Sequence, residues 1–319
     1  MRYAITINII LRVFGFIKIK WLSWEEILKV SIIDLHIHSN NSDGTDDVET
    51  LLNKINLAGI KIFALCDHDT ITGVQKINNM SINKNKNIPG FIRGIEFTCK
   101  TENFKCHILG LNYDENNIYF KRAIEAGENL RQNKFHERIN FLRDEFKINF
   151  TDSEINELLK VPGVGKLHLG NLLVKKGLAS TAFEAMEKFI DRIKTGHERL
   201  HASFIIDAIL KAGGVPVWAH PLGGIRETEP DEATFKKNLN ELISYGLKGL
   251  ECYYSKYEFS KCKWLDGVAR SKKLFISGGS DYHGANKKIP LGRLNADEKN
   301  INPENLTILE NFNLNLNFS

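Results

Sequence analysis

The stretch Ile32-Ile33-Asp34-Leu35-His36-Ile37-His38-Ser39 is an apolar run that ends in two histidines one residue apart. Side chains alternate between the faces of a β-strand, so His36 and His38 point the same way, and the polar segment 40–44 ends the strand beyond them. Two imidazoles on one face can bind one metal ion. An isolated His-x-His is equally consistent with loop histidines, so the rest of the chain has to decide.

Further groups of metal-ligating type follow in the same kind of setting. Four close an apolar or glycine-rich run and one lies inside such a run: Asp67-His68-Asp69, Glu96, His220, Asp281-Tyr282-His283 and, inside 104–111, His107. Parallel strands buried on both faces have this pattern, and catalytic groups of barrel folds project from the C-terminal ends of the strands. We therefore expect these groups to meet at one depth in the fold.

Runs that predict strands alternate with segments that predict helices, which argues for a barrel-like α/β fold. The predicted strands are 32–39, 61–65, 91–98, 104–111, 215–219, 248–252 and 274–277, and the predicted helices include 46–58, 70–77, 202–212, 231–245 and 257–271. Residues 100–103 predict a hairpin turn, so that Glu96 and His107 lie on facing arms. Asp46 and Glu49 predict a capping box, and residues 78–87 a solvated loop.

Composition sets limits on the partners and the compartment. The 319 residues carry a formal net charge of +4 spread over mixed signs, which predicts no stable binding of duplex nucleic acid but is compatible with small anionic substrates. The five cysteines have no Cys-x-x-Cys spacing and fit a reducing, cytoplasmic location. Cys66 adjoins the Asp67-His68 motif, and we interpret it as a buried core thiol.

Residues 1–30 look foreign to the domain. Charged residues interrupt their apolar sequence, so they contain no membrane span and no small-residue cleavage site. We hypothesise that Val30 is the true initiator, because Trp24-Glu25-Glu26 can be encoded by a purine-rich string that resembles a ribosome-binding site.

The order of these motifs resembles that of a known family. His-x-His, Asp-His-Asp-Thr, Glu96, His107, Ala-His-Pro and Ser-Asp-x-His follow one another as in the PHP-domain (polymerase and histidinol phosphatase) metal-dependent phosphoesterases, from about residue 31 to 292. A helical insertion before His220 makes the chain most similar to the branch that dephosphorylates nucleoside 3',5'-bisphosphates and trims short RNA from the 5' end. The resemblance implies a distorted (β/α)7 TIM-like barrel with a helical insertion. Cys66 departs from the hydroxyl residue that is usual there.

We expect a catalytic barrel from residues 31–117 and 201–292, a helical insertion that caps the substrate at 118–200, and a peripheral C-terminal segment at 293–319. Within the insertion, the branch has Arg-Pro-His where this chain has Lys166-Leu167-His168. Lysine keeps the charge for a second phosphate but lacks the bidentate fork of arginine. Lys166, His168 and, on a helical face, Arg131 are therefore the expected substrate-binding residues.

The resemblance also implies how metals would be bound. One ion would take His36, His38, Glu96 and Asp281, a second Glu96, His107 and His220, and a third Asp43, His68 and His283. Glu96 would bridge two ions, and Glu96, Asp281 and His220 are the expected catalytic residues. Mixed nitrogen and oxygen donors suit two or three divalent ions, with Mn²⁺ expected and Fe²⁺ or Zn²⁺ as alternatives. Asp43 stands where other members have histidine.

The expected function is hydrolysis of a phosphate monoester of a nucleotide, or of the 5' end of short RNA. The alternatives are a histidinol-phosphatase-like enzyme and a non-catalytic PHP module that binds metal. The complete set of nine ligands and the lack of polymerase-sized flanks favour the enzyme. No membrane partner is expected, and the sequence identifies neither a general acid nor an oligomeric state.

Overall fold

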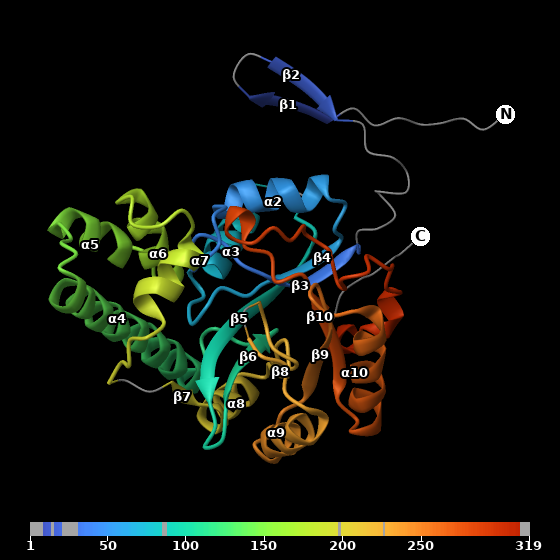
Figure 1. Ribbon diagram of the computed structural model, residues 1–319. Helices are drawn as coiled ribbons and strands as arrows, with labels where there is room; N and C mark the ends of the chain where they lie inside the picture. The colour runs from blue at the N-terminus through green and yellow to red at the C-terminus, as the bar shows by residue number, and fades with distance from the viewer. Residues whose placement is uncertain are drawn as a thin grey trace.

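The computed structural model describes residues 9–13, 16–20, 31–84, 88–196, 199–225 and 227–312. Seven strands form a nearly closed mixed barrel, so the predicted fold class is confirmed (Figure 1). Their order around the barrel is β10-β9-β8-β6-β5-β4-β3. The strands are β3 (Ile33–Ile37), β4 (Ile62–Leu65), β5 (Gly90–Lys100), β6 (Lys105–Leu111), β8 (Val215–Trp218), β9 (Gly249–Tyr254) and β10 (Phe275–Gly279).

One strand of the barrel runs against the others. β6 pairs antiparallel with both β5 and β8, whereas β3, β4 and β5 are parallel to one another, as are β8, β9 and β10. The predicted hairpin at 91–111 is confirmed, with Thr98 opposite His107 and Glu96 opposite Leu109. Since β6 is reversed, the start of β6 lies where its neighbours end.

The barrel closes where the last strand meets the first. His36 O accepts from Asp281 N at 2.8 Å, and Asp34 Oδ1 accepts from Ser280 N at 2.8 Å. Only glycine fits at 279, because a Cβ there would lie 2.2 Å from the Cβ of His36. Burial raises the pKa of Asp34 to about 6, in spite of the hydrogen bonds that its carboxylate accepts.

Helices cover the outside of the barrel: α2 (Val48–Leu57), α3 (Thr72–Lys84), α8 (Ala202–Lys211), α9 (Glu232–Ser244) and α10 (Phe259–Ser271). Their apolar sides complete one large core with the strands. On α2, for example, Val48, Leu51, Leu52 and Ile55 are buried on one face. After β10, two 3-10 turns at Pro303–Asn305 and Thr307–Asn311 cover that strand, and Ile276 N donates to Thr307 Oγ1.

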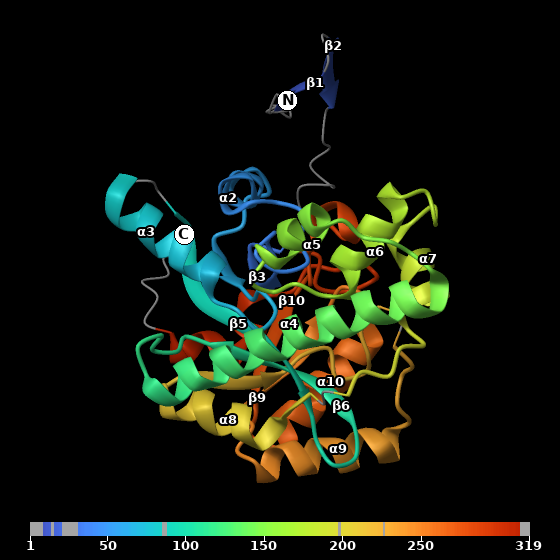
Figure 2. The same ribbon diagram turned by 90° about the vertical axis from the view of Figure 1, so that its left-hand side faces the viewer.

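Between β6 and β8 lies a helical segment with an apolar core of its own. It contains α4 (Ile118–Phe146), α5 (Asp152–Leu159), α6 (Lys166–Lys175), α7 (Ala182–Ala185), the π-helix Met186–Ile190 and the short strand β7 (Leu200–His201), which pairs with β5. Its core includes Phe135, Ile139, Leu142, Leu169, Leu173 and Ile190. Figure 2 shows α4 running across the front of the barrel, with α5 and α6 above it.

Two local predictions were wrong. The helix predicted at 70–77 continues as α3 to Lys84, because asparagine and lysine lower helix propensity too little to end it. The first residue of the predicted capping box, Asp46, does not cap α2. Asp47 accepts from Thr50 N instead, while the buried Asp46 accepts from Lys54 and Tyr282.

At the N-terminus, β1 (Ile9–Val13) and β2 (Phe16–Lys20) form a separate antiparallel pair. Val30, the hypothetical initiator, lies outside the described residues. None of the described helices is both long and apolar enough to cross a membrane.

Candidate metal centre

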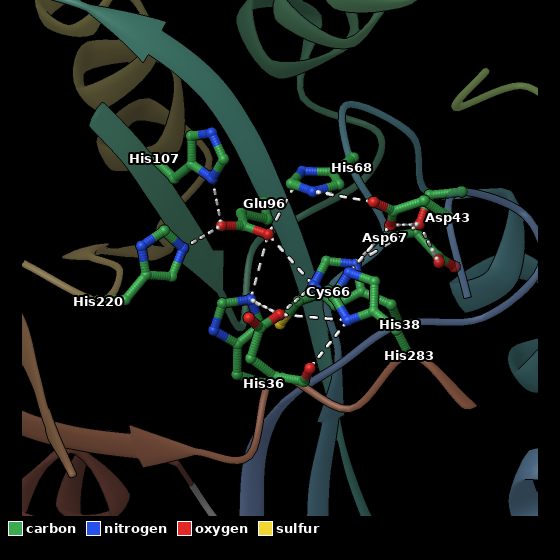
Figure 3. A network of polar contacts seen from close by, with 12 residues as sticks. His36, His38, Asp43, Cys66, Asp67, His68, Glu96, His107, His220 and His283 are labelled. Carbon is green, nitrogen blue, oxygen red and sulfur yellow. Dashed lines mark hydrogen bonds and ion pairs between the residues drawn. The ribbon is translucent and has the colours of Figure 1, made fainter. Parts of the chain in front are cut away.

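The ends of four barrel strands, the inner part of β5 and the reversed start of β6 bring the predicted ligand set together (Figure 3). His36 lies in β3 and His38 just beyond it, and His107 is the third residue of the reversed β6. Glu96 lies within β5, and the remaining residues follow β3, β4, β8 and β10: Asp43, His68, His220, Asp281 and His283.

Glu96 is the centre of this arrangement. Its Oε2 lies 3.1 Å from His36 Nε2, 3.1 Å from His38 Nε2 and 3.3 Å from His68 Nδ1. Its Oε1 lies 2.7 Å from His107 Nδ1 and 3.0 Å from His220 Nε2. Burial would raise the pKa of this carboxyl group, but the surrounding imidazoles outweigh it and hold that pKa well below its usual value.

Two other carboxylates flank Glu96 on the side of His38. Asp281 Oδ1 lies 3.3 Å from His38 Nε2, and Asp43 Oδ1 lies 3.1 Å from His283 Nε2. Burial opposes ionisation of Asp281, yet Lys287 Nζ at 2.6 Å and the neighbouring His283 keep its pKa well below the ordinary range. Burial likewise opposes ionisation of Asp43, but His283 and His68 hold its pKa well below the ordinary range, so both carboxylates are charged at neutral pH.

The donor atoms form three groups in which every ligand atom lies within 4.8 Å of the others. The groups are His38, Asp43, His68 and His283; His36, His38, Glu96 and Asp281; and His68, Glu96 and His107. The first two contain the ion sites expected from the family resemblance, with His38 shared between them. The third has His68 in place of the expected His220, although His220 also faces Glu96 Oε1.

The chemistry of these donors fits bound metal ions. His38 Nε2, His68 Nδ1 and His283 Nε2 are buried and make no hydrogen bond, although each lies 3.1–3.3 Å from a carboxylate oxygen. Buried polar atoms without partners are costly, and converging imidazole nitrogens and carboxylates are ligands for first-row divalent ions. Three ligand groups around shared residues indicate a site for more than one ion.

Backbone strain concentrates at the same place. Asp69, His220 and Asp281 have φ angles of 55°, 29° and 57°, which L-residues rarely adopt. Asp69 directly follows the candidate ligand His68, and His220 and Asp281 lie two positions after the last residues of β8 and β10. Such strain is tolerated where the surrounding structure fixes the backbone, and it often marks functional sites.

Glu251 is a site residue that the sequence analysis missed. This fully buried carboxylate in β9 accepts from His36 Nδ1 at 2.9 Å and from His220 N at 2.6 Å. A proton on Nδ1 leaves His36 Nε2 free to face Glu96, so Glu251 sets the tautomer of a candidate ligand. A carboxylate inside an otherwise apolar strand was the signal that could have identified it.

Asp67 and Cys66 have supporting positions. Asp67 accepts from Ser39 N at 2.8 Å and from Ser42 Oγ at 2.7 Å, which holds the loop that carries Asp43. The Cys66 thiol is buried and donates to Leu35 O, and burial raises its pKa far above the usual value. A thiol in this state is neither a good nucleophile nor a good ligand, in agreement with its interpretation as a core residue.

Two cavities flank the centre. The first, which we call the cation-lined cavity, has a volume of about 240 Å³ and adjoins Asp43, His68 and His107. Six basic residues line it: Arg131, Lys134, Arg138, Lys166, Arg199 and Lys287. Lys134 and Arg138 form no ion pair with any described carboxylate, and Arg138 Nε is buried without a partner. Burial and the neighbouring arginines lower the pKa of Lys134 to about 8.

Of the three expected substrate-binding residues, two line this cavity. Arg131 reaches it while its Nε donates to Asp69 Oδ2 at 2.5 Å, and Lys166 reaches it while paired with Asp191 at 2.8 Å. His168 is not among the lining residues. Its Nδ1 accepts from Gly165 N and its ring bonds the backbone of Ser42, so this side chain caps α6 and anchors a loop instead.

The second cavity, which we call the aromatic cavity, has a volume of about 300 Å³ and adjoins His107 and His220. Phe104, Trp218, Glu227 and Asn238 also line it. A small cavity of about 80 Å³ over Glu96 shares His68 and Lys287 with the cation-lined cavity, and His220 and Glu227 with the aromatic cavity. The metal centre therefore lies between a strongly basic space and a nearly neutral one.

A barrel whose strand ends collect imidazoles and carboxylates around shared ions is the architecture of a metal-dependent hydrolase. Comparison with known proteins agrees. Residues 34–197 match the model of the PHP domain family. A 5'-3' exoribonuclease of Haemophilus influenzae is 27% identical over 82% of this chain and 93% of that protein. The chain belongs to the PHP domain family, and it is a metal-dependent phosphoesterase.

Two further matches are more distant. A 3',5'-nucleoside bisphosphate phosphatase of Chromobacterium violaceum is 22% identical over 79% of this chain and 87% of that protein. The crystal structure of a candidate metal-dependent phosphoesterase from Bifidobacterium adolescentis superposes with a TM-score of 0.72 at 24% identity, over 84% of this chain and 94% of the other. The latter similarity concerns the fold alone.

Proposed function

We propose that the chain hydrolyses a phosphate ester of a nucleotide that carries a second, non-reacting phosphate, either a nucleoside 3',5'-bisphosphate or the 5'-phosphorylated end of short RNA. The cation-lined cavity beside the metal centre carries this proposal. It places Lys134 and Arg138, without described carboxylate partners, next to the candidate ligands His68 and His107. The names of the relatives from Haemophilus and Chromobacterium support the same substrate class.

Charge balance is the physical reason for this choice. Burying unpaired cations is unfavourable, and a phosphate dianion would neutralise them with charge-assisted hydrogen bonds. A phosphate held there keeps the scissile phosphate over Glu96, which lowers the entropic cost of reaching the transition state. A simple monophosphate such as histidinol phosphate would leave the cations unpaired.

For the metal centre we propose the nine ligands His36, His38, Asp43, His68, Glu96, His107, His220, Asp281 and His283, with manganese as the expected metal. Divalent ions there would supply Lewis-acid activation of the phosphoryl group and of the attacking water. Glu96 bridges two of the ligand groups and fixes their spacing, since it contacts five histidines that lie in or just after four strands. Asp281 Oδ2 accepts hydrogen bonds from Lys287 and Tyr254, and these bonds orient Asp281 Oδ1 toward His38.

The chemistry balances as a hydrolysis. The water oxygen forms a bond to phosphorus, the bond from phosphorus to the ribose oxygen breaks, and the departing oxygen takes up a proton released from the water. Lys287 lines the small cavity over Glu96, where its ammonium group can stabilise the charge of the phosphoryl oxygens. No protein nucleophile is required.

The test replaces one unpaired cation. Arg138→Ala should reduce kcat/KM for a nucleoside 3',5'-bisphosphate by roughly ten- to a hundredfold, the effect of losing one charge-assisted hydrogen bond. Hydrolysis of nucleoside 3'- and 5'-monophosphates should change much less, because they lack the second phosphate. The enzyme is loaded with manganese, and phosphate release is measured for all three substrates.

Arg143→Ala is the matched control, because Arg143 is an exposed arginine on the same helix and pairs only with nearby α4 residues. It should leave all three rates unchanged. Equal losses on bisphosphate and monophosphates in Arg138→Ala would contradict a phosphate site in the cation-lined cavity.

A further inference from the structure

We infer that the aromatic cavity is the binding site for the nucleoside on the far side of the scissile phosphate when the substrate is the 5' end of short RNA. The inference rests on the proposed function. A monoester has one organic substituent on phosphorus, whereas the diester of an RNA chain has two. The second substituent needs a space of its own.

The arrangement of the cavities supplies that space. The small cavity over Glu96 shares Lys287 with the cation-lined cavity and Glu227 with the aromatic cavity. In Figure 3, His68 and His220 lie on opposite sides of Glu96, and each borders a different cavity. A phosphorus atom held over Glu96 therefore has one side toward the cations and the other toward the aromatic cavity. Because phosphorus is tetrahedral, the two ester oxygens of a diester point in different directions, so each can lead into a different cavity while the attacking water lies in line with the leaving oxygen.

The lining of the aromatic cavity suits a nucleobase rather than a second phosphate. Lys105 and Glu227 are its only described lysine, arginine or carboxylate side chains, and their charges cancel. Phe104 is half-buried and its ring lies 5.6 Å from that of Trp218, which in turn stacks on Phe235 at 5.5 Å. Half-exposed aromatic rings supported from behind are platforms on which bases stack.

Asn238 provides a polar contact in the same cavity. It lies on the buried face of α9, is only 7% exposed, and its amide makes no hydrogen bond to another described residue. The amide is open to the cavity rather than enclosed, and it offers two donors and an acceptor to the edge of a base. The volume of about 300 Å³ is at the small end of ligand sites and suits a single base.

The bond changes are those of the proposed hydrolysis. Water adds to phosphorus, the bond to the leaving ribose oxygen breaks, and that oxygen takes the proton. The nucleoside in the aromatic cavity remains attached to the phosphate after the reaction. It leaves as a nucleotide with a new 5'-phosphate, ready to occupy the cation-lined cavity if the chain continues.

The experiment compares a 5'-phosphorylated dinucleotide with a nucleoside 3',5'-bisphosphate, which lacks the second nucleoside. Phe104→Ala should lower the ratio of kcat/KM for the dinucleotide to that for the bisphosphate roughly 5- to 150-fold, the range for losing one stacked base. Asn238→Leu should lower the ratio roughly 3- to 10-fold. Phe204→Ala is the control, because Phe204 is an exposed phenylalanine on α8 outside both cavities.

A second readout does not depend on turnover. Adenosine carries no phosphate, so calorimetry with the metal-loaded protein measures the aromatic cavity alone. Wild type and Phe204→Ala should bind adenosine alike, and Phe104→Ala should bind it more weakly by the same factor as in the kinetic ratio. Asn238→Leu should unfold at about the same temperature as wild type, since the amide that it replaces makes no hydrogen bond to another described residue.

The outcomes separate the two proposals. Wild-type protein that hydrolyses neither substrate overturns the proposed function itself. Protein that cleaves the bisphosphate but not the dinucleotide overturns only the inference on the aromatic cavity. An unchanged ratio in Phe104→Ala and Asn238→Leu, or adenosine binding that neither variant weakens, also overturns it.

Discussion

The two cavities beside Glu96 differ in almost every property except their distance from the metal centre. The cation-lined cavity collects six basic side chains, most of them from the helical segment between β6 and β8. The aromatic cavity is built by the barrel itself, from the β5–β6 turn, the end of β8 and the start of α9. Both reach His107, the one candidate ligand on the reversed strand β6.

The difference shows how one metal centre can select a substrate by two properties, its charge and its aromatic surface. Recognition by unpaired cations depends on charge, so it should weaken in salt and at a pH where a cation is neutralised. Recognition by aromatic rings depends on contact area, so it should change little with salt or with pH. Substitutions at the centre should therefore affect every substrate alike, and substitutions in one cavity should affect only the substrates that use it.

The largest expected effect is at the point that both cavities share. Glu96→Gln should lower turnover of bisphosphate and dinucleotide together by more than about 100-fold, because Glu96 belongs to two of the three ligand groups and contacts two histidines of the third. Metal analysis should find two or three divalent ions per chain in the wild type and fewer in Glu96→Gln. Removal of the metal with EDTA should abolish hydrolysis of both substrates. Survival of one activity in Glu96→Gln would mean that the cavities serve separate centres.

Glu251→Gln should have the next largest effect. The amide cannot accept from both His36 Nδ1 and His220 N, so the orientation of two ligands is lost. We expect a reduction of about 10- to 100-fold on both substrates, with weaker metal affinity. Glu232→Gln, at an exposed position on α9, is the control. A selective effect on one substrate would contradict a purely orienting role.

Lys134→Met sharpens the comparison through pH. With a pKa of about 8, Lys134 loses its charge as pH rises, so wild-type kcat/KM for the bisphosphate should fall above pH 8 relative to that for a monophosphate. In the variant, kcat/KM for the bisphosphate should be about tenfold lower than in the wild type at pH 7, and it should not fall further above pH 8. Lys121→Met, at an exposed position of the same helix, should behave as wild type.

Stability provides an independent check on Lys134. Its folded pKa lies below the ordinary 10.5, so the folded protein binds fewer protons than the unfolded chain and its stability should rise between pH 8 and 10.5. Lys134→Met should remove that rise and melt at a higher temperature at pH 7. A lower melting temperature for the variant would contradict the account of an unpaired, partly buried cation.

The smallest effects distinguish Lys166 from His168. His168→Ala should cost about 1 kcal/mol of stability, or about 2–4 °C in melting temperature, and change both substrates alike, since this ring caps α6. Lys166→Ala should leave stability nearly unchanged, because its pair with Asp191 is exposed, and lower the preference for bisphosphate a few-fold. Thermal melts and kinetics in parallel decide between the two roles.

The sequence predicted those features that a strand imposes locally. His36 and His38 alternate with buried residues, and Asp281 follows a glycine pair, so their position at strand ends could be inferred without knowing their neighbours. The hairpin of β5 and β6 was predicted for the same reason. The pairing of individual residues across the hairpin could not be predicted, because it depends on the register of the two strands. His107 lies opposite Thr98 and reaches Glu96 diagonally.

The remainder of the site depends on contacts between distant segments. Glu251 lies within β9, and only the barrel shows that it meets β3 and β8. Phe104 and Asn238 are 134 positions apart and carry no motif, so no spacing could reveal a shared cavity. Lys166 and His168 are two positions apart, but Lys166 lines the cation-lined cavity whereas His168 bonds the backbone of Gly165 and Ser42. A helical sequence pattern alone does not distinguish these two roles, because they depend on how α6 packs against the loop that contains Ser42.

The seam between β3 and β10 has a consequence for how the protein assembles. Asp34 and Ser280, which bond across it, are 246 positions apart, so nearly the whole chain has to be in place before the barrel can close. Contacts of such long range slow folding. An ion bound jointly by His36 and Asp281 would act as a clip across this seam, and the gain from closing so long a loop is large. In the apo protein, amide hydrogens of β10 and of the end of β3 should then be the first in the barrel to exchange.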